Sequence, residues 1–126
     1  MSKLSMIILY VAEQQRSKIF YEKILQKKPT FDVPGMTEFM LNENFKLGLM
    51  PEKGIAKILT PFAPHPELGN GIPRCELYLF VKNPSETLSL AINAGAKEIS
   101  KAEKRDWGDK VAYCADPDGH VIAFAK

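Results

Sequence analysis

An internal repeat at an offset of 70 residues constrains the fold of this chain more than any other feature of its sequence. Residues 7–13 (IILYVAE) and residues 77–83 (LYLFVKN) are each an apolar run that leads into a helical pattern. Similarity at a fixed offset indicates that one strand–helix unit has been duplicated. With 126 residues the chain is large enough for one core and too short for two independent ones. We therefore predict a single domain over residues 1–126.

Each half of the chain predicts the same order of elements. A first strand over residues 4–11 is followed by a helix over about 14–25, in which Phe20, Tyr21 and Ile24 share one face. In the second half Asn83 is placed to cap a helix that begins at Pro84, and Gly95 ends it. Short extended stretches follow each helix, at residues 29–32, 37–41 and 45–50 and at residues 97–100, 110–115 and 120–125. The pattern is β-α-β-β-β twice, an α+β chain.

The two halves are joined by a segment rich in Pro and Gly. Its second part, residues 61–73, contains four prolines and two glycines, at positions 61, 64, 66, 69, 71 and 73. A loop of this length inside a compact domain is usually a linker or a lid. We therefore divide the domain into module one (residues 1–51), a linker or lid (52–73) and module two (74–126).

Alternation along the strands predicts two faces for each sheet. One face is uniformly apolar, as a helix packed on the sheet requires. The other face is apolar with a few polar groups, which describes a small-molecule cup; a second ordinary core or a dimer contact would give the same pattern. Its predicted members are Met6, Ile8, Tyr10, Lys46, Gly48, Met50, Glu76, Tyr78, Phe80, Val121, Ala123 and Ala125.

Composition excludes some classes of partner. The formal charge is +2, and the Lys and Arg residues form no basic block, so we expect no nucleic-acid partner. No apolar run approaches the ~20 residues that span a bilayer, so we expect no membrane partner. Cys75 and Cys114 lack a metal or redox spacing and predict free thiols in the cytoplasm.

Three motifs in this order resemble the vicinal oxygen chelate superfamily, which includes glyoxalases, bleomycin-resistance proteins and extradiol dioxygenases. Residues 17–25 are similar to its S-x-x-F-Y-x-x-x-L helix, and residues 94–96 resemble its A-G-A/V helix end. Residues 107–108 and 116–122 resemble its W-G and D-P-D-G-N-x-I ending, with His120 in the Asn position. The resemblance implies two βαβββ modules in tandem that form a curved mixed sheet around a central cup.

The resemblance also implies where a metal would be held, namely at positions 6, 48, 76 and 123. The chain has Met6, Gly48 and Ala123 at three of these positions, so Glu76 is the one carboxylate. A divalent ion in a catalytic site needs about three protein ligands, so we predict no metal and no other cofactor. His65 in the linker and His120 after a turn do not replace the missing ligands.

We therefore expect a metal-independent small-molecule binding protein similar to bleomycin-resistance proteins, its ligand unidentified. The predicted ligand-binding residues are Met6, Ile8, Tyr10, Gly48, Met50, Glu76, Tyr78, Trp107 and Ala123. Glu76 in an apolar recess would favour a cationic or hydrogen-donating ligand. The alternative is a glyoxalase-like lyase or isomerase, with Glu76 as general base or a metal on unrecognised ligands. The resemblance also implies a homodimer, for which the mixed face is one possible interface.

Overall fold

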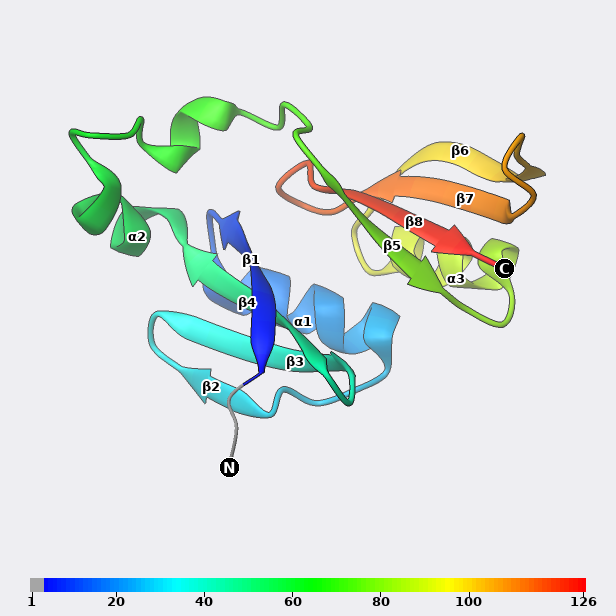
Figure 1. The fold of residues 1–126 in the computed structure, drawn as a ribbon, viewed down its shortest axis with the longest axis horizontal. Helices are drawn as coiled ribbons and strands as arrows, with labels where there is room; N and C mark the ends of the chain where they lie inside the picture. Colours follow the sequence, from blue (N-terminus) through cyan, green and yellow to red (C-terminus); the bar gives the residue numbers. More distant parts are fainter. Residues whose placement is uncertain (1–3) are drawn as a thin grey trace. The chain divides into compact units, whose positions relative to one another are not determined.

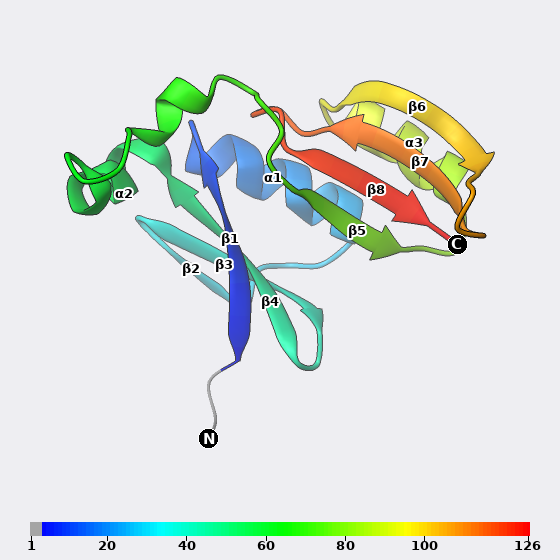
Figure 2. The same ribbon diagram turned by 45° about the horizontal axis from the view of Figure 1, so that its top comes forward.

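The computed structural model describes residues 4–126, and the chain divides into two compact units, Met1–Gly69 and Asn70–Lys126. Each unit contains a four-stranded mixed sheet with a helix packed on one face (Figures 1 and 2). The strand orders are β1-β4-β3-β2 and β5-β8-β7-β6, so the two sheets repeat one topology. The prediction of an α+β chain with two similar βαβββ modules in tandem is confirmed.

In the first unit, β1 (Ser5–Val11) pairs in parallel with β4 (Phe45–Pro51), and β3 (Met36–Asn42) pairs antiparallel with β4. The short β2 (Phe31–Val33) completes the sheet beside β3. Helix α1 (Gln14–Leu25) covers one face, and its buried Phe20, Tyr21 and Ile24 are the three residues that the helical pattern selected. The facing side chains of the strands are fully buried, among them Phe39, Leu47 and Leu49.

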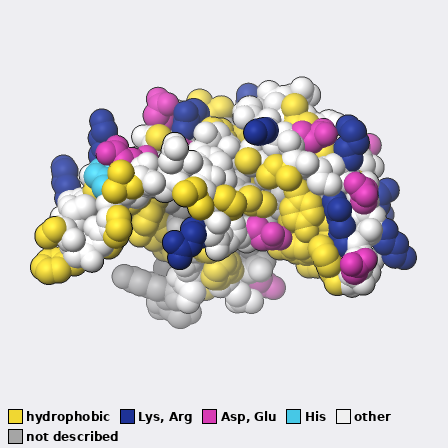
Figure 3. All heavy atoms as spheres, turned by 90° about the horizontal axis from the view of Figure 1, so that it is seen from above, with side chains coloured by type: hydrophobic (Ala, Val, Ile, Leu, Met, Phe, Trp, Pro, Cys, Tyr) yellow, Lys and Arg dark blue, Asp and Glu magenta, His cyan; other side chains and the backbone are white. Residues whose placement is uncertain are grey.

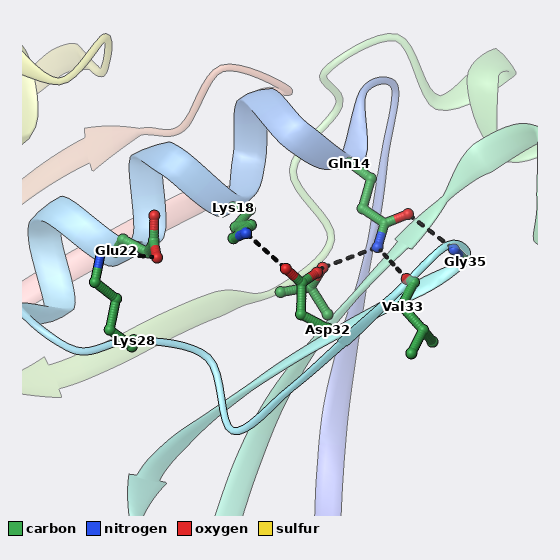
Figure 4. A network of polar contacts seen from close by, with 8 residues as sticks. Gln14, Lys18, Glu22, Lys28, Asp32, Val33 and Gly35 are labelled. Atoms are coloured by element: carbon green, nitrogen blue, oxygen red, sulfur yellow. Dashed lines mark hydrogen bonds and ion pairs between the residues drawn. The ribbon is translucent and has the colours of Figure 1, made fainter.

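A polar network fixes the β2–β3 hairpin to the start of α1 (Figure 4). The amide of Gln14 donates to Thr37 Oγ1 and to the Val33 carbonyl oxygen, both at 2.8 Å. Thr37 is fully buried, and its hydroxyl donates to Asp32. The Lys18 ammonium lies 2.6 Å from the other oxygen of Asp32. This contact is the main reason that the pKa of Asp32 is lowered, and the hydrogen bond from Thr37 is the second. These side chains lie on the helix-covered side of the sheet, so the network is structural.

In the second unit, β5 (Glu76–Phe80) pairs in parallel with β8 (Val121–Ala125), and β7 (Lys110–Ala115) lies between β8 and β6 (Lys97–Lys104). Helix α3 (Pro84–Asn93) begins as predicted, because the Asn83 side chain accepts a hydrogen bond from the Glu86 amide. The buried Ile122 and Phe124 of β8 lie on the helix-covered face.

The segment predicted as an irregular linker or lid over residues 52–73 contains regular structure. Helix α2 (Glu52–Leu59) follows β4 directly, and a 3-10 turn, η1, covers Pro66–Gly69. Helix α2 contacts β1 and β4 and buries Ala56. The sequence analysis missed this helix because Gly54 and the prolines that follow lower the local helix propensity. Most of the segment therefore belongs to the first unit.

Candidate small-molecule site

In the first unit, the face of the sheet opposite α1 is lined by methionine. The register places Met6 and Met50 on this face with Ile8, Tyr10 and Gly48, as predicted. It also adds residues of β3 and β2 that the sequence analysis did not include, because residues paired across neighbouring strands share a face. These additional residues are Phe31, Val33, Met36, Glu38 and Met40.

Gly48 lies at the centre of this open face, with thioethers close on two sides. A Cβ added at Gly48 would lie 3.2 Å from Met6 Sδ, 3.3 Å from Met36 Sδ and 3.1 Å from Ile8 Cγ1. Contacts this short are tighter than nearly all real Cβ contacts. Glycine at this position therefore lets the two sulfur atoms approach the backbone of β4.

Among the residues that the structure describes, one ion pair lies on the open face of the first sheet, and it joins Glu38 to Lys46. The Lys46 ammonium lies 2.8 Å from the Glu38 carboxylate, and the two side chains are only 20% and 13% exposed. Because each group neutralises the other, the apolar face carries a polar pair with no net charge.

In the second unit, the open face carries a hydrogen-bonded chain of three side chains. Trp107 Nε1 donates to the Tyr78 hydroxyl at 2.9 Å, and that hydroxyl donates to Asp109 Oδ2 at 2.6 Å. Two effects raise the pKa of Tyr78: the larger is the loss of contact with water, and the second is the hydrogen bond to Asp109. The phenol therefore stays protonated and acts as a donor. Trp107 is 59% exposed, and the hydrogen bond to Tyr78 engages its indole N–H.

Two tyrosines cover the floor of this second open face. Tyr78 and Tyr113 pack on Val111, Ala123 and Ala125, all three of which are fully buried. The Arg105 guanidinium lies 5.2 Å from the centre of the Tyr113 ring and donates to the Val111 carbonyl oxygen. A molecule on this face would therefore meet aromatic rings rather than Ala123 itself.

The structure places the predicted residues of each half on the open face of their own sheet. Glu76 shares its face with Tyr78 but is exposed, so it does not lie in an apolar recess. Asp109, which is half-buried, is the carboxylate that the structure brings to the aromatic side chains. That the two open faces line one cup remains a prediction from the resemblance.

The residues at the four implied metal positions do not fit a divalent ion. Met6 offers a soft thioether, Gly48 and Ala123 offer no side-chain donor, and Glu76 alone supplies an oxygen ligand. Within residues 4–126, no group of three or more His, Cys, Asp and Glu side chains is arranged to hold a metal. The donor chemistry of these positions thus supports no metal-dependent step.

The histidines and cysteines have structural surroundings. His65 Nδ1 accepts a hydrogen bond from the Glu67 amide at the start of η1. The His120 amide donates to the buried Asp116, which closes the β7–β8 turn. Cys114 is buried. Its burial, and to a smaller extent the charge of Asp116, raise the pKa of its thiol to about 12, so it is not a nucleophile.

Surface charge is mixed on the face drawn in Figure 3, where Lys and Arg side chains are interspersed with Asp and Glu and with apolar groups. No helix among the described residues is long and apolar enough to cross a membrane. Absence of a nucleic-acid partner remains a prediction from the composition.

Two tandem βαβββ units define a chain of the vicinal oxygen chelate superfamily, which confirms the resemblance. The chain belongs to the glyoxalase-like domain family, whose match spans residues 4–126. No curated protein matches the sequence.

Solved structures share the fold. A glyoxalase-related enzyme from Fulvimarina pelagi has a TM-score of 0.81 at 20% identity, with 99% of this chain and 88% of that chain covered. A glyoxalase/bleomycin resistance protein/dioxygenase family enzyme from Burkholderia phytofirmans PsJN also has a TM-score of 0.81, at 15% identity and 98% coverage of both chains. A protein from Agrobacterium tumefaciens is 26% identical, with a TM-score of 0.74 and coverage of 99% and 97%.

Proposed function

We propose that this protein binds a small organic molecule without a metal, in the manner of bleomycin-resistance proteins. The observation that carries the proposal is the Trp107–Tyr78–Asp109 chain on the open face of the second sheet. Through the Tyr78 hydroxyl it links an exposed indole to a half-buried carboxylate, on a face that also carries the Tyr113 ring. Groups that are ordered before a ligand arrives reduce the entropy lost on binding.

Asp109 replaces Glu76 in this proposal as the group that orients the ligand. One oxygen of Asp109 accepts from the Tyr78 hydroxyl, and a carboxylate has further capacity to accept hydrogen bonds. A ligand that donates a hydrogen bond or carries a positive charge would therefore be favoured beside the aromatic rings.

The lyase or isomerase alternative is not favoured by these features. It requires either a metal-binding set of donors, which the implied positions do not supply, or Glu76 as a general base. Glu76 is exposed, whereas a general base with a shifted pKa is usually partly buried beside its substrate.

Fluorescence of Trp107, the single tryptophan, provides the test of binding. A panel of aromatic amines and cationic antibiotics should include compounds that change this fluorescence saturably. Tyr78→Phe removes the hydroxyl that positions both Trp107 and Asp109, so affinity should fall by about tenfold. Tyr113→Phe keeps a ring on the same face and should change affinity by less than about twofold. Absence of a saturable response across a diverse panel would overturn the proposal.

We also propose that the protein forms a homodimer, as the resemblance implies. The support in the structure is β1, a largely apolar strand of seven residues that lies at one edge of the first sheet. An apolar edge strand is commonly covered by another chain or element. Light scattering after size-exclusion chromatography should give twice the 14.1 kDa mass of one chain. A monomer that persists as concentration rises would contradict this proposal.

Residence in the cytoplasm is a further part of the proposal. Cys75 is exposed and Cys114 is buried, and both are free thiols. Free thiols persist in a reducing compartment, which supports this assignment.

A further inference from the structure

Asn70 and Gly71 form the one Asn–Gly pair of the sequence, and they lie in the turn that follows η1. Both residues are exposed. Asn70 has a φ of +45°, in the left-handed region that residues with a side chain rarely adopt, and Gly71 has a φ of +74°. Among the residues that the structure describes, no hydrogen bond engages the Asn70 side chain or the Gly71 N–H. No hydrogen bond of this pair therefore has to break before the turn changes conformation.

An asparagine that precedes a glycine is able to lose its side-chain amide without an enzyme. The backbone nitrogen of the glycine attacks Cγ of the asparagine and forms an N–Cγ bond. The bond from Cγ to the side-chain nitrogen breaks, and ammonia leaves with the proton of the attacking N–H. Water then opens the cyclic imide at one of its two carbonyl groups, which yields aspartate or isoaspartate. Glycine has no Cβ to obstruct the approach of its nitrogen, so the pair at residues 70–71 leaves this route open.

The pair Asp118–Gly119 is the other sequence at which such a ring forms readily, with loss of water in place of ammonia. There the fold holds the attacking nitrogen, because the Gly119 N–H donates to the Asp116 carbonyl oxygen at 2.9 Å. The Asp118 amide also donates to the Asp116 carboxylate at 2.9 Å. The structure thus protects Asp118 and leaves the Gly71 nitrogen accessible.

Isoaspartate at position 70 would disturb the β7–β8 turn. Isoaspartate directs the chain through the side-chain carbonyl group, which adds one methylene to the backbone just before Gly71. Gly71 packs closely on the turn, since its Cα lies 2.7 Å and its carbonyl oxygen 3.2 Å from the place of a Cβ added at Gly119. A longer backbone before Gly71 changes this contact, whereas aspartate at position 70 changes only the charge.

We propose that Asn70 is a site of spontaneous deamidation, with the Gly71 nitrogen as the nucleophile, and that the isoaspartate product destabilises the second unit. The modification needs no ligand and is independent of the proposed binding function. The product also defines a class of partner, an enzyme that methylates the isoaspartyl carboxylate.

Incubation of the folded protein in mildly alkaline buffer tests the proposal, because the attacking nitrogen must lose its proton. Peptide mass spectrometry locates the deamidated residue, and methyl transfer by an isoaspartyl methyltransferase measures isoaspartate. Isoaspartate should accumulate at position 70 at a similar rate in folded protein and in protein unfolded with urea. Asn93 is the internal control: the Ala94 N–H donates to the Leu90 carbonyl oxygen at 3.0 Å, so Asn93 should stay intact in the folded protein.

Two variants separate the site from its consequence. Asn70→Gln should lose the methylation signal, because glutamine would have to form a larger ring. Asn70→Asp, measured before incubation, represents the aspartate product. Wild-type protein that carries isoaspartate at position 70 should unfold at a lower denaturant concentration than fresh Asn70→Asp.

Three results would overturn the inference. Asn70 that stays intact in the folded protein while it converts in urea would show that the fold protects it. Aspartate without isoaspartate would indicate direct hydrolysis of the side-chain amide in place of attack by Gly71. Isoaspartate that leaves the unfolding midpoint equal to that of Asn70→Asp would contradict the predicted effect on the second unit.

Discussion

Replacing Ala123 by glutamate is expected to destabilise the folded protein by at least about 3 kcal/mol at about pH 8. The resemblance implies a metal-binding carboxylate at this position, but Ala123 is fully buried beneath Tyr78 and Tyr113. A carboxylate there would lose its water and gain neither a metal nor a cation among its packed neighbours Val111 and Ala125. Denaturant unfolding measures the loss.

Ala123→Gln is the matched control, because it adds the same volume without a charge. Burial raises the folded-state pKa of the carboxyl group that Ala123→Glu introduces above its ordinary value of about 4.3. Below that ordinary value the two variants should be equally stable. Above it the glutamate variant should lose stability relative to the glutamine variant until the pH exceeds the folded-state pKa. Equal stability at high pH would show that position 123 tolerates a charged carboxylate, and recovery on addition of Mn²⁺ or Zn²⁺ would show that it is suited to a metal.

Gly119→Ala is expected to cost about 3 kcal/mol or more, because two penalties coincide at this position. Gly119 has a φ of +92°, and an added Cβ would lie 2.7 Å from Gly71 Cα. The neighbouring atoms are backbone, so a side-chain rotation cannot relieve the clash. The substitution would push residues 70–73 away from the β7–β8 turn, and thermal or denaturant unfolding would report the loss.

Gly108→Ala separates the two penalties. Gly108 has a similar φ of +103°, but nothing lies within 4 Å of an added Cβ. Its cost should be limited to the left-handed conformation, about 1–2 kcal/mol. If the two alanine variants were equally stable, the close approach of Gly71 to Gly119 would not constrain the second unit.

The sequence predicted the elements of the fold because each had a local cause. The Asn83–Pro84 start of α3 and the buried face of α1 follow from capping and helical periodicity, and the structure confirms both. The uniformly apolar face that alternation predicted is likewise the helix-covered side, where Leu47 and Leu49 of β4 are buried. Helix α2 was missed because its eight residues contain Gly54 and lie next to a proline-rich stretch.

The candidate site was predicted less completely, because it depends on pairings that no local pattern encodes. Met36 and Glu38 join the open face only through the register of β3 with β4. Asp109 reaches Tyr78 across 31 residues of sequence, so its place beside Tyr78 could not be predicted from spacing. The one available signal was the proximity of Asp109 to the W-G motif at residues 107–108. Glu76 shares a face with Tyr78 as predicted, but strand parity does not determine exposure.

Native mass spectrometry of a ligand-saturated sample would test metal-independent binding most directly. The protein would be treated with a chelator, mixed with a compound that changes Trp107 fluorescence, and weighed intact. We predict a complex of chain and organic molecule with no metal mass, at the same occupancy with and without the chelator. A complex that forms only when a metal is bound, or that the chelator abolishes, would contradict the account.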